Sequence, residues 1–362
     1  MSKPWNTELE IASQPGIWAG WANPLTQTAS EIRTWIIARD PDVIWLCGAG
    51  TSAFIGDALA TGLYGRLAGI PVRAIPSTDL VARPSDYIRE GQRPLVISFG
   101  RSGDSSESIG TLDILDRLAP NADRLHITCN KDSALATRPS AGLAHQRVIV
   151  LPDACHDRGF AMTSSYTTML LTALACLSDT PLEQIADNLT GLADQASAFL
   201  ESDLAVPRSK RAVFLGAGPF LGTARESALK VLELTAGRVV TSWDSTLGFR
   251  HGPKAIVDDN TVVIVFLSND VLTRKYDADI VDEIRKQFPV STVLSVGARQ
   301  EGHPAPDIAL NAHDEDIWNT ALYILVAQRL SVAWSKDLGL NVDDPFEGGN
   351  LTRVVSNVRL YT

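Results

Sequence analysis

The sequence predicts an α/β protein made of two copies of one domain, each a parallel sheet of about five strands flanked by helices. Two glycine turns mark the copies, Gly48-Ala49-Gly50 and Gly216-Ala217-Gly218, and they lie 168 residues apart. Each turn follows an apolar strand pattern and precedes a helical one. The next two apolar strands keep this offset within one or two residues. A long period with matching internal order favours duplicated domains over a solenoid.

A helical segment is expected first, over residues 1–40, where Trp side chains serve as packing anchors. The first domain, residues 41–195, alternates short Val/Ile/Leu-rich runs with longer periodic segments, as parallel sheets covered on both faces do. Its strands are expected near 43–47, 72–75, 95–99, 124–128 and 147–151, and its helices near 52–68, 105–118 and 163–178. A further helix from about residue 180 to 200 leads to the second domain.

The second domain, residues 196–340, repeats this plan. Strands are expected near 211–215, 262–267 and 291–296, and helices near 220–236, 271–287 and 315–337. The remaining stretch, residues 341–362, contains Pro345, Gly348 and Gly349 and is too irregular to form a domain. We therefore treat it as a C-terminal tail.

Composition restricts the class of function. The chain has 362 residues and a net charge of −10, which argues against nucleic acid or an anionic membrane as a partner. Its N-terminus does not resemble a signal peptide, and no apolar run approaches membrane-spanning length. The four cysteines show no CxxC pairing, and Cys47 and Cys129 fall in apolar strands. We expect buried reduced thiols and a cytoplasmic protein.

Three hydroxyl-rich loops follow expected strands of the first domain. Because ligands bind at the carboxyl ends of parallel strands, these loops could surround a phosphate with N–H and O–H donors. The alternative is that Ser102, Ser105 and Ser164 are ordinary helix N-caps. Three such loops on one sheet favour the binding site. Its expected residues are Gly50, Thr51, Ser52, Arg101, Ser102, Gly103, Ser105, Ser164 and Ser165.

A dinucleotide site is the competing interpretation, because Gly48, Gly50 and Ala53 fit a relaxed Rossmann fingerprint. That fingerprint requires an acidic residue at the end of the second strand, where it holds the ribose. Here Pro76-Ser77-Thr78 follows the strand, and Asp79 comes too late. The sequence disfavours a dinucleotide, and no cofactor is expected.

Acid–base candidates lie in the second domain. Residues 224–235 read as a helix on which Lys230 and Glu233 are neighbours. The residues expected in its buried stripe are Ala224, Ala228, Val231, Leu232 and Thr235. Glu226 is interpreted as a member of a solvated surface ion pair. A tight turn, Arg250-His251-Gly252-Pro253, presents one histidine. No metal-ligand spacing appears, since Cys155-His156-Asp157 is too local to surround an ion, and no nucleophile motif is present.

Taken together, these motifs resemble the sugar isomerase (SIS) family with two tandem domains. The chain resembles the isomerase half of glucosamine-6-phosphate synthase. It is more similar to the stand-alone bacterial tagatose-6-phosphate ketose/aldose isomerases and galactosamine-6-phosphate deaminases. The resemblance covers residue 40 to the end, and its further carriers are the runs at 227–233, 250–253 and 350–353.

The resemblance implies roles for individual residues. Ser52, Ser102, Ser105 and Ser164 would hold the sugar phosphate. Glu233 would move a proton between C1 and C2, with Lys230 beside it. His251 would open the sugar ring and reach the site of a neighbouring subunit, which implies a homodimer. In the C-terminal tail, Arg353 occupies the place of the synthase's catalytic lysine.

Three departures from the family pattern matter. Gly100 stands where the family has the first serine of its second loop. The stretch from Glu233 to His251 is about two residues longer than in the synthase. Arg353 cannot form a Schiff base, because a guanidinium stays protonated.

The direction of reaction follows from the lack of a glutaminase domain ahead of residue 40, which would supply ammonia. We therefore expect deamination of galactosamine-6-phosphate to tagatose-6-phosphate. Alternatives are tagatose-6-phosphate ketose/aldose isomerisation and glucosamine-6-phosphate deamination. A sugar-phosphate-sensing regulator is the non-enzymatic alternative, although residues 1–40 show no basic cluster for DNA.

Overall fold

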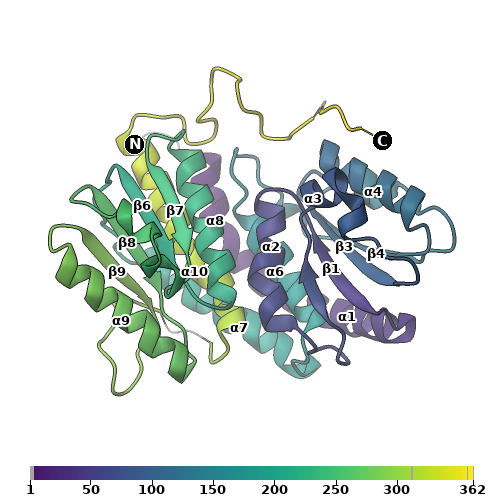
Figure 1. Cartoon of the computed structure of the whole chain (residues 1–362), viewed down its shortest axis with the longest axis horizontal. Coiled ribbons are helices and arrows are strands. Elements are labelled where there is room, and N and C mark those ends of the chain that lie inside the picture. Colours follow the sequence, from purple (N-terminus) through teal and green to yellow (C-terminus); the bar gives the residue numbers. More distant parts are fainter. Residues whose placement is uncertain (1–3, 311–312, 357, 362) are drawn as a thin grey trace. The chain divides into compact units, whose positions relative to one another are not determined.

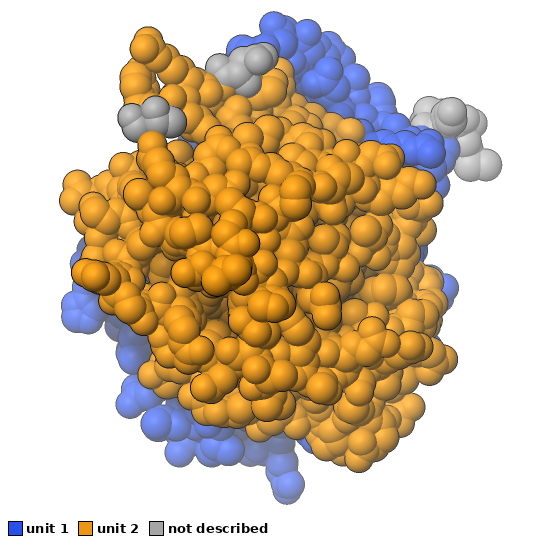
Figure 2. All heavy atoms as spheres, turned by 90° about the vertical axis from the view of Figure 1, so that its right-hand side faces the viewer, with its two compact units in different colours: residues 1–15, 158–163, 190–351 blue, residues 16–157, 164–189, 352–362 orange. Residues whose placement is uncertain are grey.

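The computed structural model describes residues 4–310, 313–356 and 358–361. The chain forms two compact units, which Figure 2 distinguishes by colour. Unit 1 comprises residues 1–15, 158–163 and 190–351, and unit 2 comprises residues 16–157, 164–189 and 352–362. Each unit is therefore discontinuous along the chain, whereas the sequence repeat divides it into contiguous stretches.

Unit 2 contains a five-stranded parallel sheet in the order β2-β1-β3-β4-β5. Its strands are β1 (Val43–Cys47), β2 (Val72–Ala74), β3 (Pro94–Gly100), β4 (Asp123–Thr128) and β5 (Gln146–Val150). Its helices are α2 (Thr51–Leu63), α3 (Ser77–Ala82), α4 (Ser106–Leu118), α5 (Ala134–Thr137) and α6 (Ser164–Leu177). Figure 1 shows α2 and α6 on one face of this sheet and α3 and α4 on the other.

Unit 1 repeats the architecture with a parallel sheet in the order β10-β9-β8-β6-β7. The strands are β6 (Arg211–Leu215), β7 (Val240–Asp244), β8 (Thr261–Phe266), β9 (Thr292–Gly297) and β10 (Ile308–Ala309). Helix α9 (Val271–Gln287) covers one face, and α8 (Pro219–Leu234) and α10 (Asp316–Asp337) cover the other (Figure 1). The predicted fold class is confirmed.

Two long helices carry the chain between the units. α1 (Asn6–Arg39) occupies the N-terminal segment, and α7 (Leu182–Glu201) follows the first sheet. Two α1 tryptophans pack against α6: Trp18 and Trp21 donate to the hydroxyls of Thr167 and Thr172 at 3.3 and 3.0 Å. Trp18 is fully buried, as expected of a packing anchor. Within the described residues, none of the helices combines the length and apolar character needed to cross a bilayer.

The alternation of apolar side chains along the strands builds two cores in unit 1. Val213, Val263 and Val265 face α9, where they meet Ile280 and Ile284. The intervening strand residues face α8 and α10. There the Phe266 ring lies 6.3 and 6.0 Å from those of Phe220 on α8 and Tyr323 on α10, which stack on each other at 4.8 Å between centroids. The sheet is thus buried on both faces, as its continuous apolar strands predict.

The structure adds elements that the sequence did not indicate. β7 is an edge strand with Val240 and Trp243 exposed by 54% and 40%, so it lacks a continuous apolar run. α3 and α5 are single short helices, and β10 is two residues long. The helix expected to reach residue 68 ends at Leu63, because Gly65 and Ala68 take positive φ angles of 72° and 52°.

Candidate active site

The two glycine turns are superimposable in backbone conformation. Gly50 is the N-cap of α2 with φ 56° and ψ −130°, and Gly218 is the N-cap of α8 with φ 56° and ψ −129°. A Cβ at Gly48 would lie 2.5 Å from the Ser52 backbone, and one at Gly216 would lie 2.6 Å from the Phe220 carbonyl oxygen. Only glycine fits either position, because these turns bring the helix N-terminus against the strand end.

The first two hydroxyl-rich loops lie at one edge of the unit 2 sheet. β1 and β3 are adjacent central strands, with Cys47 in register with Ser98. Their carboxyl ends lead into the glycine turn before α2 and into the Arg101–Ser105 loop before α4. The connection after β1 leads to α2 on one face of the sheet, and the connection after β3 leads to α4 on the other face. Open α/β sheets bind ligands where the connections of adjacent strands diverge in this way. The expected loops are therefore neighbours.

The Arg101–Ser105 loop combines a buried cation with half-buried hydroxyls. Arg101 is 6% exposed, and Ser102 and Ser105 are half-buried. Ser105 is the N-cap of α4, since its Oγ accepts the Ser108 N–H at 3.2 Å. The Asp104 carboxylate is turned away from these groups and accepts the Ala134 N–H at 2.7 Å. The loop thus presents hydroxyl and cationic donors at a helix N-terminus.

The third loop is arranged differently. Ser164 and Ser165 are fully buried, and both hydroxyls donate to the carboxylate of Asp157, with Ser164 Oγ at 2.6 Å from Oδ1. The Asp157 carboxylate also accepts the backbone N–H of Ser164 and Ser165 at 3.0 and 2.9 Å. Asp157 therefore caps α6. Asp157 has no recognisable signature in the sequence, because it lies seven residues before the helix, outside any capping-box spacing.

The C-terminal tail lies on the same loops of unit 2. Arg101 Nη2 donates to the Arg353 carbonyl at 3.0 Å, and the Ser106 N–H donates to the Val355 carbonyl at 3.2 Å. Arg353 itself is exposed. Burial, and then the positive charges of Arg353 and Arg101, lower the pKa of His156 below its ordinary value. Cationic side chains thus gather at this edge of the unit.

The acid–base candidates lie on α8 in unit 1. Lys230 Nζ is 2.5 Å from Oε2 of Glu233 and 3.3 Å from Oε1 of Glu226. The Lys230 and Glu226 side chains are 1% and 0% exposed, and that of Glu233 is 23% exposed. The interpretation of Glu226 as a surface residue is wrong, and Leu232, assigned to the buried stripe, is 40% exposed. The other expected stripe residues, Ala224, Ala228, Val231 and Thr235, are buried, so the buried face of α8 includes its charged residues as well as the predicted apolar ones.

His251 occupies the tight turn as expected. It is exposed, and it follows a short 3₁₀ helix, Gly248–Arg250, whose Arg250 pairs with Glu283 at 2.7 Å. Gly252 has φ 122°, which lets the chain reverse directly after the histidine. Within the described residues, no three His, Cys, Asp or Glu side chains are grouped so as to hold a metal ion.

Comparisons with known proteins bear on these features. The SIS domain family model matches residues 38–178. A D-galactosamine-6-phosphate deaminase, AgaS of Escherichia coli, is 37% identical over 98% of this chain and 95% of its own length. The chain belongs to the SIS family.

Other relatives agree with this assignment. The crystal structure of tagatose-6-phosphate ketose/aldose isomerase from Escherichia coli matches with a TM-score of 0.88 and 36% identity, over 99% of this chain and 96% of that one. Glutamine–fructose-6-phosphate aminotransferase from Vibrio vulnificus is 28% identical over 72% of this chain and 44% of its own length. The SIS relationship thus extends over both units of the chain.

Proposed function

We propose that this SIS protein is an enzyme that deaminates galactosamine-6-phosphate to tagatose-6-phosphate and ammonia. Support comes from the near full-length relatives, whose names assign amino-sugar-phosphate deamination and ketose/aldose isomerisation. The observation that carries the chemistry is the Lys230–Glu233 pair, a carboxylate that is 23% exposed beside a buried ammonium. Such a carboxylate can reach a substrate proton while remaining partly desolvated.

In this proposal the loops of unit 2 hold the phosphate. Arg101, Ser52, Ser102 and Ser105 provide charge-assisted donors, and the N-termini of α2 and α4 favour a dianion. Ser164 contributes through the hydroxyl that it now donates to Asp157. Because the whole chain carries a net charge of −10, an anionic substrate depends on these local donors.

Glu233 then moves one proton. His251 assists ring opening, which exposes the C1 aldehyde of the substrate. The Glu233 carboxylate removes the proton from C2, the electron pair forms the C1–C2 double bond of an enolamine, and the C1 oxygen takes a proton. The same carboxyl group, whose proton exchanges with solvent, delivers a proton to C1, and the amino nitrogen gives one up, which leaves an imine at C2. Water adds to this imine and ammonia leaves, so one water is consumed for each ammonia released.

The test is to mix the protein with galactosamine-6-phosphate and glucosamine-6-phosphate in deuterium oxide and to measure ammonia and the product by NMR. We expect ammonia from the galacto substrate and deuterium at C1 of tagatose-6-phosphate. Glu233→Gln should lower kcat by about 10²–10⁴-fold and leave KM nearly unchanged. Normal kcat in Glu233→Gln would reject the proton shuttle.

Two outcomes would redirect the assignment. Interconversion of tagatose-6-phosphate with an aldose, without ammonia, would assign the protein as a ketose/aldose isomerase. Binding without turnover would assign a sugar-phosphate sensor.

A further inference from the structure

Helix α8 buries one more charged side chain than an ion pair needs. Lys230 already has a partner in Glu233, whose Oε2 lies 2.5 Å from Nζ. Glu226, one turn earlier on the helix, brings a second carboxylate to 3.3 Å from the same ammonium, and its side chain is fully buried. Three charges therefore share one site, with a net charge of −1.

This arrangement is costly for folding. Each buried ion loses several kcal/mol of hydration, and the attraction within the pair must offset that loss. The second carboxylate adds its own desolvation, and it repels the first. Stability alone would therefore favour an uncharged residue at 226. A role of Glu226 in the chemistry of Lys230 and Glu233 would explain why this desolvation cost is tolerated.

Glu226 changes the net charge of the three groups during the proposed proton transfer. When the Glu233 carboxylate takes a proton from C2, it becomes neutral, and the net charge of the three groups rises from −1 to 0. Without Glu226, the same step would take the pair from 0 to +1 and leave a buried ammonium with no counter-charge. In a site of low dielectric, the neutral end state is strongly preferred.

We propose that Glu226 is a positioning residue, which holds the Lys230 ammonium from the buried side and so keeps Glu233 a strong base. This inference rests on the proposed role of Glu233 as the proton shuttle. The electrostatics of Lys230 support it. Burial alone would lower the pKa of Lys230, but Glu226 and then Glu233 outweigh burial and hold that pKa above its ordinary value. Lys230 therefore stays charged, and its position is fixed by both carboxylates.

The test compares Glu226→Gln, which keeps the shape and removes the charge, with Glu226→Asp, which keeps the charge. We expect Glu226→Gln to lower kcat by roughly 3- to 30-fold, because Glu233 then faces the Lys230 ammonium alone and becomes a weaker base, and to leave KM within about twofold. Glu226→Asp should retain more of kcat. Equal losses in the two variants would overturn the proposal.

A double-mutant cycle separates this role from a purely structural one. If Glu226 acts through Lys230, then adding Glu226→Gln to Lys230→Met causes no further loss of kcat, because the ammonium that it holds is gone. Multiplicative losses would show that Glu226 acts independently, and would reject the proposal. Thermal denaturation identifies the folded variants. If the Lys230→Met variant does not fold, the comparison of kcat in Glu226→Gln and Glu226→Asp tests the proposal on its own.

Ser227→Ala is the matched control. Ser227 is the next residue on α8, is fully buried, and its Oγ donates to the Thr223 carbonyl at 2.7 Å. It should keep kcat near the wild-type value. Glu233→Gln distinguishes failure of the Glu226 role from failure of the proton shuttle. If that variant is inactive while Glu226→Gln has wild-type kcat, only the role of Glu226 is rejected; if Glu233→Gln is fully active, the proton shuttle itself is rejected.

Discussion

Ser102 and Ser164 differ in what their hydroxyls can offer a ligand. Ser102 is half-buried, and its Oγ accepts the Asp104 N–H at 3.3 Å, so its own proton remains available for a phosphate oxygen. Ser164 is fully buried and already donates to Asp157. A phosphate could use the Ser164 hydroxyl only after that bond is exchanged. Ser102 is therefore the sharper probe of the proposed phosphate site.

We predict that Ser102→Ala raises KM for galactosamine-6-phosphate and leaves kcat nearly unchanged. The loss of one charge-assisted hydrogen bond costs roughly 1.5–3 kcal/mol, about 10- to 150-fold in KM. Steady-state kinetics measure this. Ser140→Ala serves as the control, because the Ser140 hydroxyl donates to a loop carbonyl, that of Ala144, at 3.1 Å and lies outside the phosphate loops. An unchanged KM in Ser102→Ala would place the phosphate elsewhere.

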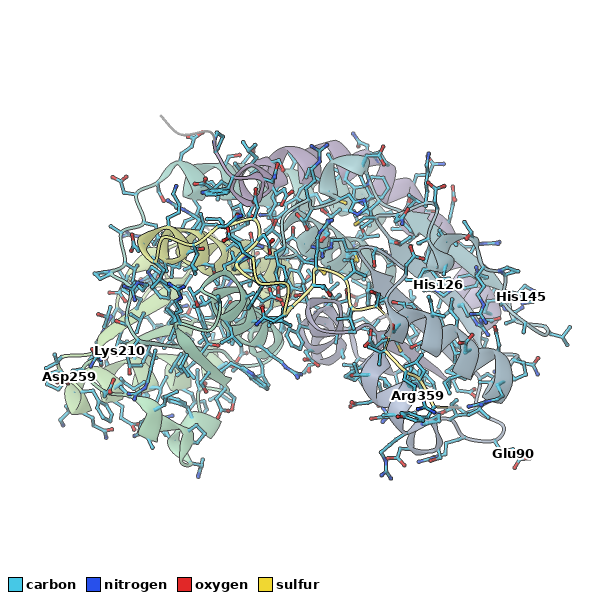
Figure 3. The ribbon with its side chains drawn as sticks, turned by 90° about the horizontal axis from the view of Figure 1, so that it is seen from above. Glu90, His126, His145, Lys210, Asp259 and Arg359 are labelled. Atoms are coloured by element: carbon cyan, nitrogen blue, oxygen red, sulfur yellow. The ribbon has the colours of Figure 1, made fainter. Side chains whose placement is uncertain are left out.

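His126 offers a test at the residue scale that does not depend on catalysis. It lies on β4 within unit 2, whereas His145 lies at the outer side of that unit (Figure 3). Burial, and then the charge of Arg124, lower the pKa of His126 to about 4. The folded protein therefore holds this imidazole neutral, whereas the unfolded chain protonates it near its ordinary pKa of about 6.5.

We predict that His126 contributes stability that is fully present above pH 6.5 and is lost as the pH falls toward 4. The loss over this window is about 3 kcal/mol. His126→Gln cannot titrate, so its free energy of unfolding should decline less steeply between pH 6.5 and 4. Urea titrations across that range measure the difference, with His145→Gln as the exposed control. Parallel curves for wild type and His126→Gln would contradict the prediction.

At the scale of single elements, α6 depends on one carboxylate. The helix is buried along its whole length, so its first N–H groups have no water to bind. Asp157 takes two of them, together with two buried hydroxyls. We predict that Asp157→Ala lowers the free energy of unfolding by about 2–4 kcal/mol, because four donors lose their acceptor. Chemical denaturation measures the change.

A control shows whether that loss is specific to the cap. Asp270 caps α9 in the same manner, and its Oδ1 accepts the Thr273 N–H at 2.8 Å, but it is exposed to solvent. Asp270→Ala should cost about 1 kcal/mol. Equal effects of the two substitutions would show that the burial of α6 does not amplify its cap.

The elements that could be predicted from the sequence are those whose pattern is set by burial. The central strands β1, β3, β6 and β8 read as continuous apolar runs because both faces of each sheet are covered. The edge strand β7 could not be found this way, since its residues are partly exposed and polar. Helix α8 was found, and four of the five residues expected in its buried stripe are buried, but the burial of its charged residues was not predicted. Its stripe of Glu226 and Lys230 is polar in sequence and buried in the structure, and no periodicity of apolar residues indicates that.

The same limit applies to the candidate site. The glycine turns and serine loops were predicted because their residue types fit strand-to-helix turns. Asp157 was missed because it caps a helix from a distance, and the tail's contact with Arg101 was missed because it joins residues 252 positions apart. Such pairings are fixed by tertiary packing, which leaves no local signal.

At the scale of the whole molecule, we predict a homodimer in which His251 serves the partner's site. His251 is exposed on a rigid turn, as a residue donated to another chain must be. Mixtures of His251→Ala and Glu233→Gln proteins, with subunit exchange allowed, should then regain up to about a quarter of the wild-type activity, because one in four sites combines two intact residues. No recovery in exchanged dimers, verified by mass, would show that each site is built from one chain.

The duplicated glycine turn has a consequence for how the two halves can diverge. After Gly50 the first copy continues with Thr51 and Ser52, whereas after Gly218 the second continues with Pro219 and Phe220. Proline has no amide hydrogen, and the phenylalanine ring is fully buried against Tyr323. The second copy therefore has the backbone shape of the first turn but lacks the hydroxyls of Thr51 and Ser52 and the amide hydrogen at residue 219. Under the proposed function, packing alone limits mutational drift in the second turn, whereas the phosphate also limits drift in the first. A deep mutational scan should show this asymmetry, with Phe220 tolerating apolar replacements and Ser52 tolerating almost none.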